Sequence, residues 1–237
     1  MMDRKTVFAF IAVSLASGGC SVNEIITAEE SELVVAELAK DENLLLDIGI
    51  IEFDAGIPEN NDPEDTRIYE PIRGAESRYF AYHLKNTMQG TGHWGAVRVI
   101  PNESAFTDVI VRARIEESDG EFVELIVDVS DASGQHWFSS KYETQTGISS
   151  YSENRDRRQD PYQKVFNDIA NDIHTFATTL PPDYVRRLQQ ISELQFFADM
   201  QPAAYGEHLQ VDDDSLVTVN RLPAENDPAV GRLRQIR

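Results

Sequence analysis

Two runs of alternating apolar and polar residues, 108–118 and 122–130, form the clearest pattern in the chain. Ser118-Asp119-Gly120 lies between them and is typical of a tight turn. The pattern therefore predicts a β-hairpin with every second side chain on one core face. The core-facing set is Val109, Val111, Ala113, Ile115, Val123, Leu125, Val127 and Val129. The predicted register pairs Ile115 with Val123 and places Arg114 opposite Glu124.

A third antiparallel strand is predicted at His136–Glu143, after a second turn. Setting Val129 against His136 places Phe138 and Tyr142 in the core and Trp137 on the opposite face. That opposite face then carries four large apolar residues, Ile110, Phe122, Ile126 and Trp137. A freely solvated sheet face is usually more polar than this, so we expect a later segment or a partner protein to cover it.

Other segments predict the remaining elements of an α+β fold. Leu44–Phe53 is a continuous apolar run, as in a central strand buried on both faces. Asp160-Pro161, followed by Gln163, is a strong helix start. The further predicted elements are helix 71–90, strand 94–100, helix 183–197, strand 216–222 and helix 229–237. We predict a mainly antiparallel sheet of four to five strands with helices packed on one face, followed by a mainly helical C-terminal extension.

The first 21 residues have the three-part layout of a secretory signal peptide. Arg4 and Lys5 form a basic start, and the apolar run Val7–Leu15 is too short to span a membrane. Ser17-Gly18-Gly19-Cys20 resembles a bacterial lipoprotein processing site. That resemblance implies cleavage before the cysteine, acylation of its sulfur and new amino group, and, with Ser21 next, release to the outer membrane. Ordinary secretion with a free thiol is the alternative.

These features divide the chain into four parts. Residues 1–19 are the predicted signal peptide, and residues 20–43 are a tether that includes either a short amphipathic helix or a mobile linker. Residues 44–180 form the predicted α/β domain, and residues 181–237 form the extension. The last predicted helix has no stop signal, so a longer natural chain is left open.

Charge and cysteine content narrow the partners and the chemistry. The formal net charge of −20 disfavours DNA, RNA and anionic head groups as partners. The single cysteine rules out an intrachain disulfide, so burial alone must hold the core. Residues 155–158 hold the one dense basic spot, which we expect to pair with nearby carboxylates.

The sequence contains no recognisable catalytic or cofactor motif. Five histidines are scattered without metal-ligand spacing, so we predict no metal site and no cofactor. Trp94 follows a glycine-rich bend, and two interpretations of it are open. Its side chain either packs into a helix–strand junction as a plug or, with Tyr79 and Tyr82, lines a groove for a glycan or a lipid.

The predicted order of strand, helix, strand, three-stranded meander and helix over residues 44–180 resembles a small α/β domain of envelope lipoproteins. Such proteins include the curli-secretion lipoprotein, lipoprotein activators of penicillin-binding proteins, and the N-terminal domain of the Tol-system propeller protein. Segments 73–79, 94–99, 118–120 and 160–161 are similar to patterns in uncharacterised proteobacterial lipoproteins, which bring no activity with them.

We therefore predict a non-catalytic lipoprotein, anchored to the periplasmic face of the outer membrane through Cys20. Its predicted role is that of an assembly or accessory factor that binds another envelope protein. The predicted contact residues are Ile110, Phe122, Ile126 and Trp137, on an exposed sheet face or edge. A periplasmic module that binds glycan or lipid is the alternative function. The sequence does not determine the oligomeric state.

Overall fold

A five-stranded sheet lies at the centre of the computed structural model, which describes residues 31–37, 42–62, 64, 68–101, 107–145 and 160–237. Its strand order is β2-β1-β3-β4-β5. The strands are β1 (Ile48–Ile51), β2 (Val97–Ile100), β3 (Val109–Ser118), β4 (Phe122–Asp131) and β5 (His136–Gln145). The α+β class is confirmed. The sheet is mixed, because β1 runs parallel to both its neighbours while β3, β4 and β5 form an antiparallel meander.

Strand β1 is an interior strand, and the burial of its side chains accounts for its apolar sequence. Ile48 and Ile50 are fully buried on the core face. On the other face, a Cβ atom at Gly49 would lie 2.6 Å from Thr107 Oγ1, so only glycine permits this close approach. The 3₁₀ turn η1 (Glu42–Leu44) precedes β1, and helix α2 (Glu70–Gly90) connects it to the parallel strand β2.

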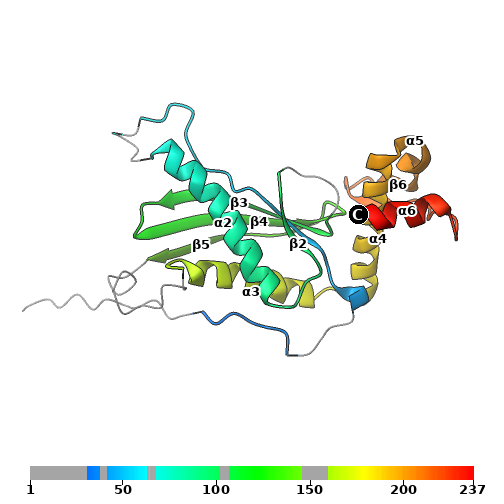
Figure 1. Cartoon of the computed structure of the whole chain (residues 1–237), viewed down its shortest axis with the longest axis horizontal. Coiled ribbons are helices and arrows are strands. Elements are labelled where there is room, and N and C mark those ends of the chain that lie inside the picture. Colours follow the sequence, from blue (N-terminus) through cyan, green and yellow to red (C-terminus); the bar gives the residue numbers. More distant parts are fainter. Residues whose placement is uncertain (1–30, 38–41, 63, 65–67, 102–106, 146–159) are drawn as a thin grey trace, which may run out of the picture.

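Helices α2 and α3 (Gln163–Thr178) pack on the core side of the sheet, with α2 crossing in front of it in Figure 1. Phe80, Leu84 and Met88 of α2 are buried there. Helix α3 begins after the predicted start: Asp160 Oδ1 accepts a hydrogen bond from the Tyr162 N–H at 2.8 Å within a turn. No side chain caps the N-terminus of α3.

The predicted register of the first hairpin is wrong by two residues, although both faces are correct. Ile115 lies opposite Leu125, and Arg114 lies opposite Ile126. A β-bulge beyond Ile115 then shifts the pairing by one further residue before the turn. A shift of two residues leaves every side chain on its own face, so alternation does not distinguish the two registers.

The predicted register of β5 is also wrong by two residues, and a bulge changes one side chain's face. Val129 lies opposite Phe138 and Leu125 lies opposite Tyr142, so Trp137 is an extra residue beside the pair Ser130–His136. A bulge re-aims side chains. Trp137 is only 7% exposed and stacks on Phe176 of α3 with ring centroids 4.8 Å apart. The prediction that it points to the opposite face is therefore wrong.

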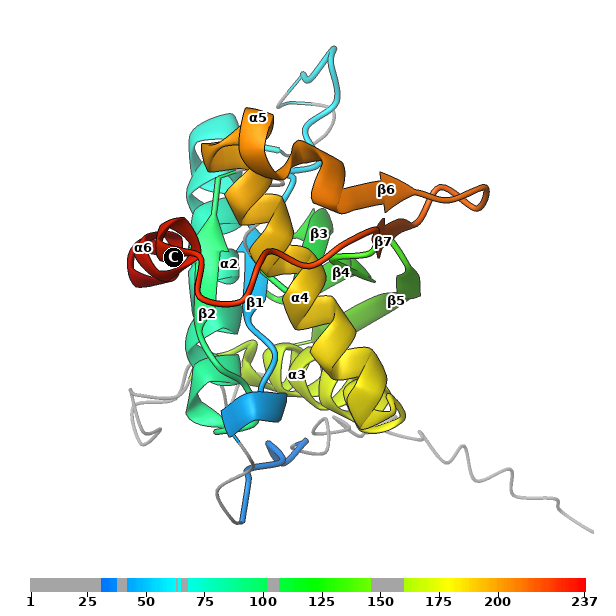
Figure 2. The same cartoon turned by 90° about the vertical axis from the view of Figure 1, so that its right-hand side faces the viewer.

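The C-terminal region adds helix α4 (Pro182–Met200), which crosses one end of the sheet in Figure 2. The elements after α4 are α5 (Pro202–Tyr205), η3 (Gly206–His208), the hairpin β6 (Leu209–Val211) and β7 (Val217–Val219), and α6 (Pro228–Ile236). Asp227 caps α6, its side chain accepting from the Ala229 N–H at 2.8 Å. Val185 and Leu188 of α4 join the main core. A second, smaller apolar cluster consists of Leu194, Phe196, Phe197, Tyr205, Val230 and Leu233.

In the part of the chain that the structure describes, no helix combines the length and the apolar character needed to cross a membrane.

Candidate functional site

Polar side chains join α4 to the end of the sheet that it crosses. Three aspartates lie there at strand ends: Asp47 before β1, Asp108 before β3 and Asp131 at the end of β4. Asp108 and Asp131 are each only 2% exposed. A buried carboxylate is costly unless several donors surround it, so the partners of these residues decide their role.

Asp108 lies at the centre of a buried network. Its Oδ2 accepts from the Asp47 N–H at 2.8 Å, and its Oδ1 accepts from the hydroxyl of Ser192 on α4. Arg237 Nη2 lies 3.6 Å from Asp108 Oδ1 and donates to Ser192 Oγ at 2.8 Å. Burial raises the pKa of Asp108, while the two hydrogen bonds and the nearby guanidinium partly offset that rise.

Asp131 is surrounded by five donors. Its Oδ1 accepts from the Ser133 N–H at 2.9 Å, the Ser133 hydroxyl at 2.5 Å and the Gln135 N–H at 3.2 Å. Its Oδ2 accepts from Trp137 Nε1 at 2.9 Å and from the Tyr184 hydroxyl at 2.7 Å. Burial raises the pKa of Tyr184 to about 12, and the bond to Asp131 contributes to the rise. These five donors come from the turn after β4, from β5 and from α4. Asp131 therefore acts as a structural junction between β4, β5 and α4.

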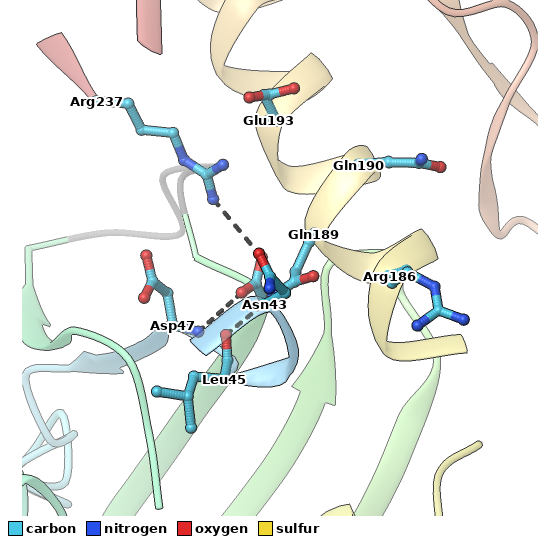
Figure 3. Close-up of a pocket in the computed structure, with 9 residues that line it drawn as sticks. Asn43, Leu45, Asp47, Arg186, Gln189, Gln190, Glu193 and Arg237 are labelled. Atoms are coloured by element: carbon cyan, nitrogen blue, oxygen red, sulfur yellow. Dashed lines mark hydrogen bonds and ion pairs between the residues drawn. The ribbon is translucent and has the colours of Figure 1, made fainter. Parts of the chain in front are cut away.

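An open cavity of about 490 Å³ lies beside Asp108 (Figure 3). Its lining residues are Asn43, Leu45, Asp47, Asp108, Arg186, Gln189, Gln190, Glu193 and Arg237. Acidic and basic groups in this lining are already engaged with protein partners: Glu193, for example, binds Arg234 through two contacts of 2.7 and 3.0 Å. The nine lining residues are mostly polar or charged and include three carboxylates and two arginines.

The three residues of the predicted ligand groove are not brought together. Trp94 is 6% exposed and meets His174 edge-on at 6.2 Å, as expected for a plug at the helix–strand junction. Tyr79 and Tyr82 instead expose 50% and 58% of their surface on α2. Burial therefore removes Trp94 from any surface that a glycan or lipid would touch beside the two tyrosines.

Two histidines that are far apart in the sequence meet in the fold. His93 and His174 stack with centroids 3.6 Å apart and planes 9° apart. His93 Nε2 also contacts the Val34 carbonyl at 3.1 Å. Within the described residues, no group of three or more histidine, cysteine, aspartate or glutamate side chains is arranged to hold a metal ion.

The sheet face opposite the helices carries Ile110, Phe122 and Ile126, as predicted. Ile126 is 39% exposed, whereas Ile110 and Phe122 are half-buried. Ion pairs between neighbouring strands occupy much of the remaining face: Arg112 with Asp128, and Lys141 with Glu124. With Trp137 on the other face, the predicted contact surface is smaller and more charged than the sequence suggested.

A larger exposed apolar surface lies on α2. Tyr69, Ile72, Tyr79 and Tyr82 are exposed by 61%, 60%, 50% and 58%. Tyr69 lies at the N-cap position of α2, and the other three follow one side of the helix together with the exposed Ala75. We call these five residues the outer stripe of α2. From Ile72 onward the spacing alternates between three and four residues, which is the spacing of a helix–helix seam.

Polar contacts orient the aromatic part of the outer stripe. The Tyr79 hydroxyl donates to Asp160 Oδ2 at 2.5 Å, and burial together with this bond raises the pKa of Tyr79 to about 12. Lys85 Nζ lies 5.7 Å from the centre of the Tyr82 ring, a cation–π distance. Arg78 is exposed on the same side of the helix. The stripe is thus apolar, with the basic Arg78 and Lys85 beside it and the carboxylate of Asp160 bonded to Tyr79.

Sequence reasoning missed the buried contacts of Asp108, Asp131 and Ser192. A usable signal was present, because each of the central strands β1, β3 and β4 begins or ends next to an aspartate. Cys20 and the basic spot at residues 155–158 lie outside the described residues.

Comparisons with known proteins add little. No family model matches the chain, and no curated protein matches it. Among solved structures, the hypothetical protein CT253 from Chlamydia trachomatis is similar at 12% identity and a TM-score of 0.38, over 56% of this chain and 99% of that one. A PelC dodecamer from Paraburkholderia phytofirmans is similar at 18% identity and a TM-score of 0.32, over 67% of this chain and 94% of that one. Similarities this low carry no argument about function.

Proposed function

We propose that this protein is a periplasmic lipoprotein anchored to the outer membrane, where it acts without catalysis as an assembly or accessory factor. The lipid anchor is supported by the leader-like segment and by the small residues before Cys20. A non-catalytic role is supported by the internal hydrogen bonds of the buried carboxylates, which leave them engaged in holding α4 to the sheet.

The observation that carries the binding role is the outer stripe of α2. Three large residues on α2 and Tyr69, at its N-cap position, are at least half exposed, although exposed aromatic and aliphatic side chains cost free energy when they gather on a surface. Tyrosine is also enriched at protein interfaces, because its ring buries a large area and its hydroxyl tolerates water. The stripe therefore suits a partner protein better than bulk solvent.

Spacing and charge indicate the chemistry of that partner. An apolar seam with alternating steps of three and four residues accommodates a second helix. Arg78 and Lys85 are seven residues apart and lie next to the seam, so they favour acidic residues on the facing helix. We propose that the partner is another envelope protein that presents an amphipathic helix with acidic flanks.

The anchor is tested by metabolic labelling with a fatty-acid probe in the native host. Cys20→Ala is expected to abolish the label and to release the protein from the membrane fraction. A labelled Cys20→Ala chain, or an unlabelled wild-type chain with a free thiol, would refute the anchor.

The binding surface is tested by photo-crosslinking in intact cells. A photoreactive residue replacing Tyr82 is expected to yield one defined adduct, and the same residue at Val211, which is 67% exposed on β6, serves as the matched control. Arg78→Glu with Lys85→Glu should reduce the Tyr82 adduct at least fivefold, because an acidic partner is then repelled. Equal adducts at both positions, or an adduct insensitive to the charge reversal, would contradict the proposed surface.

A further inference from the structure

An extended segment at residues 31–37 lies across α3 and across the turn that follows α2. It is drawn in blue, alongside α3 in Figure 1, and we call it the strap. Asn171 contacts it twice, since its Nδ2 donates to the Glu32 carbonyl at 2.9 Å and its Oδ1 accepts from the Val34 N–H at 2.9 Å. Asn167 Nδ2 donates to the Ser31 carbonyl at 2.7 Å. One helix face therefore holds three main-chain groups of the strap.

The other edge of the strap is held by the turn after α2. The Ala36 N–H donates to the Thr91 carbonyl at 2.8 Å. His93 Nε2 lies 3.1 Å from the Val34 carbonyl, so this ring nitrogen carries the proton and donates it. Thr91 and His93 are 1% and 6% exposed, which makes this side of the site a rigid part of the fold.

Recognition of the strap depends on its backbone. A carbonyl at residue 32 and an N–H at residue 34 are the pair of groups that a neighbouring parallel strand would use, and the Asn171 amide takes the place of that strand. Only Leu33 packs against the core, while Val34 and Val35 remain 48% and 53% exposed. The strap thus adds little apolar burial, in contrast to the strands of the sheet.

We infer that the strap is a releasable latch that sets how far the domain reaches from its anchor. This inference rests on the proposed lipid anchor at Cys20. With the strap docked, ten residues (21–30) separate Cys20 from the domain, a span of at most about 35 Å. With the strap released, 21 residues (21–41) separate Cys20 from η1, and the span grows to at most about 75 Å.

The low apolar burial of the strap is the reason to treat it as separable. Segments that are held mainly by hydrogen bonds near solvent open more readily than the core. The core strand β4, by comparison, has Val123, Leu125, Val127 and Val129 fully buried. Release of the strap exposes Leu33 and two asparagines and leaves the sheet and its helices in place.

Hydrogen exchange on the full chain tests the latch. In the wild type, the amides of Val34 and Ala36 should exchange at least 100-fold faster than that of Val127. Asn171→Ala should accelerate Val34 and Ala36 at least fivefold and leave Val127 unchanged. Thr175→Ala, one turn further along α3, bonds only within the helix and should change neither group.

Two results would overturn the latch. Strap amides that exchange only as fast as Val127 would make the strap part of the global folding unit. Strap amides that do not respond to Asn171→Ala would show that the asparagine does not hold them. Both readouts work on unlipidated chain, so a failure of the anchor, seen by fatty-acid labelling, is distinguishable from a failure of the latch.

The reach itself is measured on lipidated protein in vesicles, by energy transfer from a donor on α6 to an acceptor in the bilayer. Asn171→Ala should lower the transfer efficiency relative to wild type and Thr175→Ala, because a longer tether allows the domain to move away. An unchanged efficiency in a variant with accelerated strap exchange would refute the control of reach.

Discussion

The Asp131 junction makes the sharpest quantitative prediction, because one carboxylate there accepts five hydrogen bonds at 2% exposure. Asp131→Ala leaves those five donors without their acceptor. The Gln135 N–H keeps the Ser133 hydroxyl as a second acceptor at 3.3 Å. A cavity of this size admits about one water, which accepts two of the other four bonds, so about two donors remain unpaired. At about 1–3 kcal/mol for each unsatisfied buried donor, we expect a loss of about 2–5 kcal/mol.

Equilibrium urea unfolding, followed by tryptophan fluorescence, measures this loss at pH 7. Tyr184→Phe removes only one of the five donors, and should cost about 1 kcal/mol. Asp128→Ala is the matched control, because Asp128 has a side chain that is 39% exposed and pairs with Arg112 at 3.9 Å on the open face. Such a surface pair contributes at most about 1 kcal/mol. A loss at Asp131→Ala no larger than the loss at Asp128→Ala would refute the junction.

Further predictions concern the core, the buried carboxylate and the outer stripe. Trp137→Ala should cost about 3–5 kcal/mol in urea unfolding, whereas Ile126→Ser should cost less than about 1 kcal/mol, since only Trp137 is packed against α3; equal losses would place both in one environment. Asp108 has a raised pKa when folded, so the folded state holds this proton more tightly than the unfolded chain, whose value is 3.8. Its contribution to stability therefore falls as pH rises from 3.8 through the folded pKa, and Asp108→Asn should remove that slope from urea titrations between pH 3 and 7; an unchanged slope would exclude Asp108 as its source. Ile72→Ser and Tyr82→Ser should change stability by less than about 0.5 kcal/mol each, because both side chains are already exposed, and larger losses would mark the stripe as part of the core.

The sequence was sufficient for the elements and for most of the faces, because side-chain periodicity directly reports burial. Helix α2 and strands β3 and β4 form where the apolar spacing predicts them. The pairing register of the strands could not be predicted from the alternation, because a shift of two residues leaves every side chain on the same face. Two bulges, beyond Ile115 and at Trp137, change the pairing further. At the second bulge, Trp137 packs on Phe176 of α3 and donates to Asp131, and both contacts are absent from the alternation of the strand itself.

The long-range polar contacts of the fold could not be predicted from the sequence for a different reason. Asp131 and Tyr184 are 53 residues apart, Asp108 and Ser192 are 84 apart, and Val34 and Asn171 are 137 apart. In an acidic chain with 41 carboxylates, position alone does not single out the few that become buried. Burial and geometry identify them, and both exist only once α4 and the strap have docked.

The sequence of helix α2 has two apolar stripes, and either could have faced the core. One contains Phe80, Leu84 and Met88, and the other contains Tyr79 and Tyr82. A helix lying on a sheet buries only one face, and the more aliphatic stripe, which loses no polar group on burial, is the one inside. The tyrosine stripe remains outside, where the Tyr79 and Tyr82 side chains are 50% and 58% exposed. Tyr79 bonds Asp160 and stacks on His83 within the domain. The exposed ring of Tyr82 is therefore the part of this stripe that we propose a partner helix covers.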